Sequence, residues 1–450
     1  MLLVFALTWA LLLAGIVLVF NTGTLVGERI RLQQISDNAA YSGAVWQARC
    51  LNYLAYCNRA IVADLAFVAY LNAVVSHFGA WSEVLTYLQI IASLIPYVGG
   101  IISQIINVIQ EVMDAIADIV EEIKNSGVWE LVMQSIYWTQ QGFVLYTENT
   151  TEEVMKQIAL EADPNVSIND DSDVSDVNKQ NFQALYKDAK GEGEKIRYVT
   201  SLTLSPWTSG DDSGMIPIVN RDWHAFPEEV EYLLKLLGYL PGPPPFPSQI
   251  GINGNVELNN DGIKTEDYGF AGFWDYDYPD PTDPFDWDWG WEYSEIPLST
   301  THTEERDVDW DDIGFYNFKN SGPKSAGVYA VAQKKWSTMP AFIFQKVLGG
   351  SFAGSSSAMA VPKNDLKVIS KAITTYEDPE IGSSRWSTLK SENKDPNLWN
   401  PFWHAELVAI NSYPPGITPN EDYNSGDSEN MLSSQFGSTG GWPWQMVESH

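Results

Sequence analysis

The most unusual group of side chains that could bind a ligand lies between Phe273 and Glu295, where aspartates alternate with tryptophans and tyrosines. Alternate residues of an extended segment point to opposite sides, so one side would carry carboxylates and the other aromatic rings. Calcium takes about six to eight oxygen ligands, and carboxylates supply them. The aspartates that the alternation offers for a calcium site are Asp275, Asp277, Asp286 and Asp288.

Three interpretations of this stretch stay open. The rings could form a platform for a host or surface glycan, or the carboxylates could hold Ca²⁺. The third interpretation, which we favour, is an aromatic edge packed on its own domain with a solvated acidic face. A weaker second cation loop is suggested by oxygen-bearing side chains at alternate positions, namely Asn253, Asn255, Glu257, Asn259 and Asp261, although no EF-hand spacing is present.

The residues typical of catalysis are scattered. The chain has five histidines and no H-E-x-x-H or C-x-x-C metal motif. The run Gly349–Gly354 misses the G-x-S-x-G nucleophile motif because Ala353 replaces the last glycine, and His404-Ala405-Glu406 is an isolated H-x-E. We therefore predict that the protein is not an enzyme and has no cofactor, with Ca²⁺ at the acidic stretch staying open as an alternative.

Charge and cysteine content narrow the classes of partner. The formal net charge is −32, which repels phosphate backbones and argues against a nucleic-acid partner.

Cys50 and Cys57 are seven residues apart, or about 10 Å along one helix, which is too far for a disulfide between them. We expect both to be small apolar core residues. Two sequons, at Asn149 and Asn165, are consistent with glycosylation outside the cell, but chance gives about as many.

The first 27 residues are the stretch around which the chain is organised, because no charge occurs before Glu28. A helix of this length can cross the ~30 Å apolar core of a bilayer, and its apolar surface must be buried in lipid or protein. The side chains that we expect to make these contacts are Leu2, Leu3, Phe5, Leu7, Trp9, Leu12, Ile16 and Phe20. No basic residue precedes the apolar run, so we expect that a short leader has been removed and that Met1 is a mature N-terminus.

Helical spacing continues beyond the apolar start. Small or apolar residues recur every three or four positions from Leu32 to Val68, and a turn is predicted at His77–Gly79. A second run, Val84 to Ile123, keeps a period of 3.5, which is the coiled-coil repeat. Pro96 and Gly99-Gly100 should kink or split it. A second membrane span over Val84–Gln110 stays open but is less favoured, because polar residues line one side.

A third helix is predicted from Val128, with a break near Thr147–Asn149 and a capping box at Thr150–Glu153 that starts a short helix. The three helices would form an antiparallel stalk. Beyond Asp163 the composition changes. We expect strands at Tyr198–Leu204, Gly327–Ala332 and Ala341–Val347, and a helix at Glu228–Leu237.

These elements predict an α+β protein in which a long N-terminal hydrophobic helix continues into an antiparallel helical stalk, followed by a mixed, loop-rich, β-containing domain. The expected division is a membrane or filament-core helix at 1–27, a coiled-coil-like stalk at 28–162, and an acidic globular domain rich in tryptophan and tyrosine at 163–450.

The segment after the span resembles the TadE/TadG-like pilus-assembly family. The matching residues are Arg31, Leu32, Gln33, Asp37, Ala39, Ala40, Gly43 and Ala44. A shorter stretch, Asn397–Leu407, is similar to a segment near the end of some large relatives. The sequence departs from the broader type IV pilin pattern at Phe5, where those pilins carry glutamate, so the helix would assemble by apolar packing alone.

The resemblance implies export as a pilin-like precursor, a membrane location before assembly, and a structural role in an extracellular filament of the tight-adherence type. The protein would then partner with itself through the N-terminal helices. The alternative is a membrane-anchored cell-surface adhesin that binds calcium or a glycan.

Overall fold

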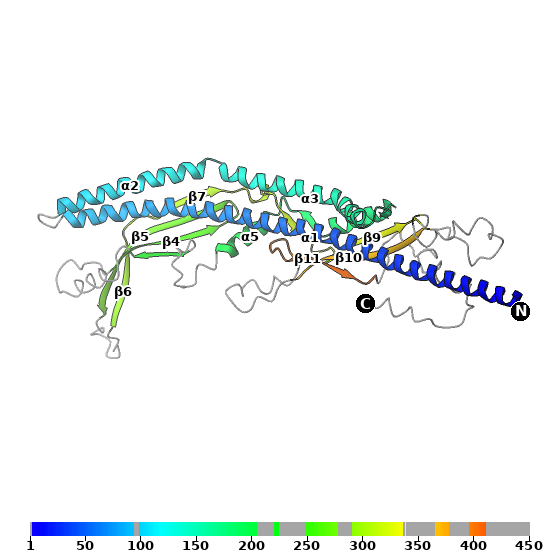
Figure 1. The fold of residues 1–450 in the computed structure, drawn as a ribbon. Helices are drawn as coiled ribbons and strands as arrows, with labels where there is room; N and C mark the ends of the chain where they lie inside the picture. The colour runs from blue at the N-terminus through cyan, green and yellow to red at the C-terminus, as the bar shows by residue number, and fades with distance from the viewer. Residues whose placement is uncertain are drawn as a thin grey trace. The chain divides into compact units, whose positions relative to one another are not determined.

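The computed structural model describes residues 2–93, 99–170, 172–204, 220–224, 249–277, 290–335, 338, 365–377 and 396–410, to which the following statements refer. The protein is α+β, as predicted (Figure 1). The helices are α1 (Leu2–Ser93), α2 (Gly99–Asn125), α3 (Val128–Ala162), α4 (Ser172–Gln183), α5 (Gly193–Leu204) and the 3₁₀ turn η2 (Trp310–Asp312). The strands are β1 (Val166–Ile168), β2 (Tyr186–Asp188), β3 (Asn220–His224), β4 (Gln249–Leu258), β5 (Gly262–Asp277), β6 (Gly290–Pro297), β7 (His302–Asp307), β8 (Tyr316–Phe318), β9 (Ala326–Lys334), β10 (Leu366–Tyr376) and β11 (Trp403–Val408).

The chain divides into two compact units, and each unit combines parts of the long helices with later residues. The first unit comprises Met1–Asn58, Trp138–Asp188 and Tyr316–His450. The second unit comprises Arg59–Tyr137 and Ala189–Phe315. Helices α1 and α3 therefore contribute residues to both units.

The first unit is built on an antiparallel sheet with the order β1-β9-β10-β11. Strand β9 is buried on both faces, because its residues alternate between two helical layers. Val328 and Ala330 pack against α1 and α3, whereas Tyr329 and Val331 pack against Val174 of α4. The main core of this unit consists of Leu32, Ile35, Ala39, Ala40 and Ala44 from α1, Met155 and Ala159 from α3, and residues of β1, β9 and β10.

Helices α1 and α3 run antiparallel in the first unit, as predicted. Trp46 Nε1 donates to Thr150 Oγ1 at 3.1 Å, and Gln140 Nε2 donates to Asn58 Oδ1 at 2.8 Å. Later residues of α1 therefore contact earlier residues of α3, which is the antiparallel arrangement. The predicted break at Thr147–Asn149 is wrong. The hydroxyls of Thr150 and Thr151 donate to the carbonyls four residues earlier within an unbroken helix, so they do not cap a new one.

The second unit contains a sheet with the order β3-β4-β5-β6, and β7 also pairs with β5. Ala80 and Val84 of α1 pack on Ile250 and Ile252 of β4. Helix α2 lies antiparallel to this part of α1, because Gln89 bonds to Asn107 and Thr86 bonds to Gln110.

Two further local predictions are wrong. No turn occurs at His77–Gly79, because α1 continues to Ser93. Gly79 instead permits a close approach, since a Cβ there would lie 2.6 Å from His302 Nδ1. The segment expected as a strand at Tyr198–Leu204 belongs to α5, in which Ile196, Thr200 and Leu204 are buried at a helical spacing of four.

Other predictions at this level are confirmed or lie beyond the described residues. Strand β9 covers the predicted strand at Gly327–Ala332, and α3 begins at Val128 as predicted. The helix predicted at 228–237 and the strand predicted at 341–347 fall outside the described residues.

Candidate functional site

The start of α1 presents apolar side chains to solvent all round the helix. Of the residues predicted to make assembly contacts, Phe5, Leu7, Trp9, Leu12, Ile16 and Phe20 are each between 53% and 65% exposed. The side chains of Leu2 and Leu3 lie outside the described part of the chain. A helix of this kind is stable in water only when lipid or another protein surface covers it.

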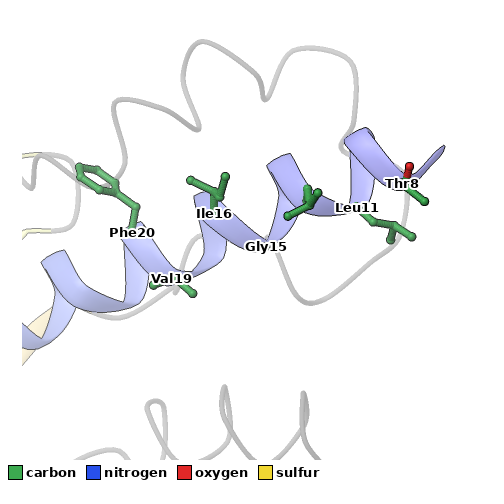
Figure 2. Close-up of a pocket in the computed structure, with 7 residues that line it drawn as sticks. Thr8, Leu11, Gly15, Ile16, Val19 and Phe20 are labelled. Carbon is green, nitrogen blue, oxygen red and sulfur yellow. The ribbon is translucent and has the colours of Figure 1, made fainter. Parts of the chain in front are cut away.

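One side of this helix is hollowed. Thr8, Leu11, Ile16, Val19 and Phe20 border an open apolar groove, and Gly15 lies between them (Figure 2). A Cβ at Gly15 would meet nothing within 4 Å. The groove is a shallow depression along a single helix, so its shape suits the side-chain ridge of a neighbouring helix better than a small ligand.

The structure offers one further stretch for a membrane-span assignment. Among the described residues, Thr22–Ile90 of α1 is long and apolar enough to cross a membrane, but 61% of its most apolar 18-residue segment is buried inside the protein. Burial of this degree is typical of a core helix. The continuous run of exposed apolar side chains on α1 therefore lies before Thr22, and beyond it such side chains are exposed only singly, as at Ile30 and Phe67. The segment 84–110, left open as a second span, is divided between α1 and α2.

An ion cluster lies where the charge-free segment ends. Lys334 Nζ at the end of β9 is 2.7 Å from Glu28 Oε2 and 2.8 Å from Asp163 Oδ2, and only 5% of the lysine side chain is exposed. Arg31 adds a bond to the Ala162 carbonyl at 3.2 Å. The cluster joins α1, the end of α3 and β9. Sequence reasoning missed Lys334, because 306 positions separate it from Glu28 and nothing in its local sequence marks it.

The pKa values in this cluster follow from two opposing effects. Burial would raise the pKa of Asp163, but hydrogen bonds from Lys334 and from the Asn165 amide outweigh it, so the pKa is lowered. For Lys334 the signs are opposite: burial alone would lower its pKa, but the hydrogen bonds to Asp163 and Glu28 outweigh burial, so the pKa is raised. Each ion is therefore held in its charged form by the other.

The small residues of the TadE/TadG-like motif allow α1 to approach its neighbours closely. Ala39, Ala40 and Ala44 are fully buried. A Cβ at Gly43 would lie 2.8 Å from Met155 Sδ and 3.0 Å from Val328 Cγ1, so a larger residue would displace one of these side chains. The motif therefore packs α1 tightly against α3 and β9.

The polar residues of the same motif attach α1 to β10. Gln33 Nε2 donates to Ser370 Oγ at 2.9 Å and to Asp37 Oδ1 at 3.0 Å. Ser370 in turn donates to Asp37 Oδ1 at 2.6 Å. This closed network satisfies polar groups between the helix and the sheet and fixes their register.

The second stretch of resemblance, Asn397–Leu407, also has a structural role. Asn397 Oδ1 accepts the amides of Trp399 and Asn400 and so shapes the turn before β11. The backbone of Trp403 exchanges two hydrogen bonds with the side-chain amide of Asn52, at 2.8 and 2.9 Å. The side chain of Asn52 therefore makes the pair of hydrogen bonds that a neighbouring strand would make, and it fixes β11 to α1.

The described residues do not test the predicted calcium site. Asp275 and Asp277 lie at the end of β5, where only the backbone is described, and Asp286 and Asp288 lie outside the described part. The weaker cation loop at 253–261 is strand β4 with its hairpin turn, in which Asn259 Oδ1 accepts the amides of Asp261 and Gly262. That oxygen is already used by the turn.

Serine, histidine and aspartate do meet in the second unit, in an arrangement unsuited to catalysis. Ser76 Oγ donates to Asp267 Oδ2 at 2.5 Å, so the hydroxyl is bonded to the carboxylate and not to an imidazole. His77 Nδ1 faces the other oxygen of Asp267, and Trp81 Nε1 donates to His77 Nε2 at 3.0 Å. Because the indole occupies the nitrogen that a general base would use, the cluster is structural.

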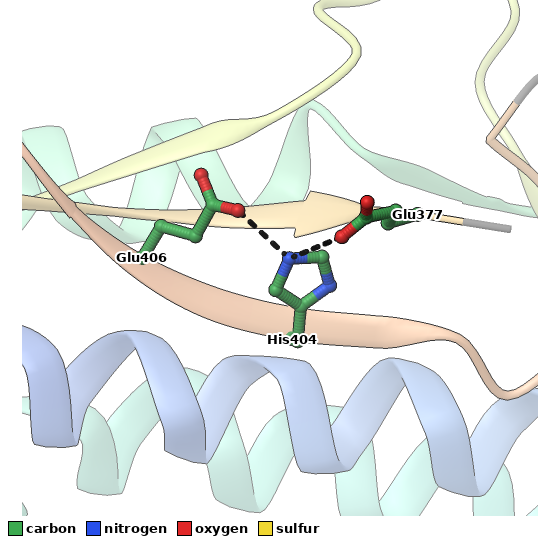
Figure 3. A group of neighbouring side chains, drawn as sticks. All are labelled: Glu377, His404 and Glu406. Carbon is green, nitrogen blue, oxygen red and sulfur yellow. Dashed lines mark hydrogen bonds and ion pairs between the residues drawn. The ribbon is translucent and has the colours of Figure 1, made fainter. Parts of the chain in front are cut away.

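An exposed group at the edge of the first sheet contains the predicted H-x-E pair. His404 Nε2 lies 3.0 Å from Glu406 Oε1 and 3.6 Å from Glu377 Oε2 (Figure 3). Within the described part of the chain, these three side chains have ligand atoms that lie close enough together to hold one metal ion. Both carboxylates are turned toward the imidazole and half or more of each is exposed, so the contacts describe a surface ion-pair cluster.

The remaining sequence candidates also have places in the structure. Asn149 lies within α3, and its amide donates to the Leu145 carbonyl, so it is not in the loop that was expected there. Asn165 is exposed in the turn between α3 and β1. Cys50 and Cys57 are buried free thiols, as predicted.

Comparison with known proteins agrees with the resemblance in the first part of the chain. Residues 1–47 match the family model of Flp pilus-assembly TadE/G-like proteins. The matched segment contains the exposed apolar start of α1 and the whole motif that packs on the first sheet. No curated protein and no solved structure matches the chain.

Proposed function

We propose that this protein is a non-enzymatic structural component of a tight-adherence (Flp-type) pilus, a pilin-like subunit that assembles through its N-terminal helix. The observation that carries the proposal is the exposed apolar surface of α1 between Val4 and Phe20, within the segment that matches the pilus-assembly family.

The physics of that helix supports a role in assembly. Burying apolar surface contributes about 25 cal/mol per Å², so the ten large apolar side chains between Val4 and Phe20 that are more than half exposed favour any state that covers them. A membrane covers them before assembly, and the same helices of neighbouring copies cover them afterwards. The absence of charge before Glu28 makes both environments accessible.

The attachment of α1 to the rest of the first unit supports the same role. The close packing at Gly43 and the ion cluster at Lys334 fix the helix just beyond the apolar segment. A subunit held in a filament by its helix must transmit force from that helix to its folded body. We infer a location at the cell surface, with the helix in the membrane first and in the filament later.

A single charge placed in the apolar segment tests the proposal. Asp in place of Leu12 should cost about 2.5–3.5 kcal/mol in a membrane or an apolar filament core. We expect the Leu12→Asp variant to fold but to be lost from both the membrane fraction and the filaments. Gln34→Asp is the matched control, because it adds the same charge at an exposed position of α1 beyond that segment. Equal partition and assembly of both variants would refute the proposal.

A further inference from the structure

Helix α2 has two apolar faces, of which its own unit uses one. The inner face includes Ile106, which is 7% exposed, and Lys124, whose Nζ bonds to Glu304 at 2.8 Å. Gln110 on the same face donates to the Ser82 carbonyl of α1. The outer seam is exposed, with each side chain between 42% and 58% accessible, and consists of Ile105, Ile109, Val112, Ile116, Ile119 and Ile123.

The outer seam keeps the strict alternation of four and three that the sequence shows. A period of 3.5 residues keeps a stripe of side chains facing a second helix over several turns. The inner contacts of α2 do not use this stripe, so no contact among the described residues of the second unit accounts for its regularity. β-branched side chains at every position of the seam suit interdigitated packing against another helix.

The charged side chains of α2 lie mostly on the side of the helix away from the seam, and they are distributed unevenly along its length. Residues 103–110 carry no charge, whereas Glu111, Asp114, Asp118, Glu121 and Glu122 are all exposed in the second half. Parallel pairing of two such helices would bring the two acidic halves together at the same end of the pair. Antiparallel pairing places the acidic half opposite the uncharged half, which avoids most of this repulsion.

We propose that the outer seam of α2 binds the same seam of a second copy of this chain, antiparallel and about a two-fold axis near Asp114. In this register Ile105 meets Ile123 of the second copy, Ile109 meets Ile119, and Val112 meets Ile116. Two such faces bury on the order of 1,000 Å², which is where specific interfaces begin. The contact is separate from the N-terminal helix and does not depend on the proposed function.

Disulfide trapping on the detergent-solubilised full-length chain tests the register. In the double variant Ile109→Cys/Ile119→Cys, the thiol at position 109 of each copy faces the thiol at position 119 of the other copy. We expect most of the protein to migrate as a covalent dimer without reductant. The two positions are about 15 Å apart on one helix, so they cannot bridge within a chain. Each single variant places its two thiols about 15 Å apart across the dimer and should stay monomeric on the gel.

The control places thiols on the opposite side of the helix, each about 3 Å along the helix axis from its counterpart in the seam. Asn107→Cys/Glu121→Cys is symmetric about the same point, and both residues are exposed but lie off the seam, so we expect no dimer. The native thiols Cys50 and Cys57 are buried, and the unmodified chain measures their background. Dimers from the single variants would overturn the antiparallel register. The absence of any dimer from the seam double variant, with a monomer by sedimentation, would overturn the proposal.

Discussion

Replacing Lys334 by methionine should weaken the attachment of α1 to the first unit. Methionine keeps most of the side-chain volume but removes the cation that lies 2.7 Å from Glu28 and 2.8 Å from Asp163. Asp163 is 5% exposed, so its charge would stay buried with no equivalent partner. Arg31 lies 3.7 Å from Asp163 and is half exposed, so it replaces the lysine only in part.

The size of the effect follows from burial. Removing one partner of a buried ion pair costs about 3–5 kcal/mol, because the remaining charge is uncompensated. A whole domain is stable by only about 5–15 kcal/mol, so the loss is a large fraction of the total. At about 2–4 °C per kcal/mol for a unit of this size, the melting temperature should fall by roughly 10 °C.

The pH dependence separates electrostatic loss from simple packing loss. The folded-state pKa of Asp163 is lowered, so its stabilising contribution is complete at neutral pH and is lost as the pH falls through that pKa. In the variant the buried carboxylate has lost its cation and should take up a proton more readily on acidification. The difference in melting temperature between the two proteins should therefore be largest near pH 7 and smaller near pH 4.

Thermal unfolding of the detergent-solubilised chain, followed at several pH values, measures this difference. Lys335→Met is the matched control, because the neighbouring lysine is exposed and its loss should change the melting temperature very little. A Lys334→Met variant that is as stable as the control, or one whose deficit is the same at pH 4 and pH 7, would refute the reasoning.

Three more predictions concern single residues of α1. Gly43→Val should destabilise the first unit by about 1–3 kcal/mol by overpacking against Met155 and Val328, and Met155→Ala should restore part of the loss; full stability of Gly43→Val in urea unfolding would contradict the packing. Burial raises the pKa of Asp64 to about 6, and its Oδ2 has no hydrogen-bond partner among the described residues. Its contribution therefore becomes increasingly destabilising as the pH rises from the ordinary aspartate pKa of about 4 to about 6, and is fully destabilising above that. Asp64→Asn should raise the melting temperature more at pH 7.5 than at pH 4.5. Burial raises the pKa of Cys50 to about 12, so iodoacetamide should label it in the native protein far more slowly than in urea, as followed by mass spectrometry; equal rates would show that the thiol is accessible.

Local spacing in the sequence predicted the long helices and the apolar surface of the first residues. The recurrence of small and apolar residues from Leu32 onward identified the buried face of α1, and the charge-free start identified the exposed one. Spacing failed where two periods fit the same residues. Tyr198–Leu204 alternates like a strand, but the burial of Ile196, Thr200 and Leu204 at intervals of four makes it part of a helix.

Contacts between distant residues were beyond the sequence. Nothing near Lys334 indicates that it meets Glu28, and nothing near Trp403 indicates that its backbone binds the side chain of Asn52. The 3.5-residue repeat of α2 was visible, but the sequence could not tell which of its apolar positions face the protein. The structure shows that Ile106 faces inward and Ile105 outward, one residue apart.

Filaments sheared from the producing cells provide the most direct test of the central claim, which is that α1 holds this protein in a polymer. Electron microscopy of the sheared material should show filaments, and mass spectrometry should find this chain in them with its first 27 residues present. A chain that carries Leu12→Asp should be missing from the same preparation. A sheared fraction without this protein, while the protein stays in the membrane, would contradict the account and leave the membrane-anchored alternative.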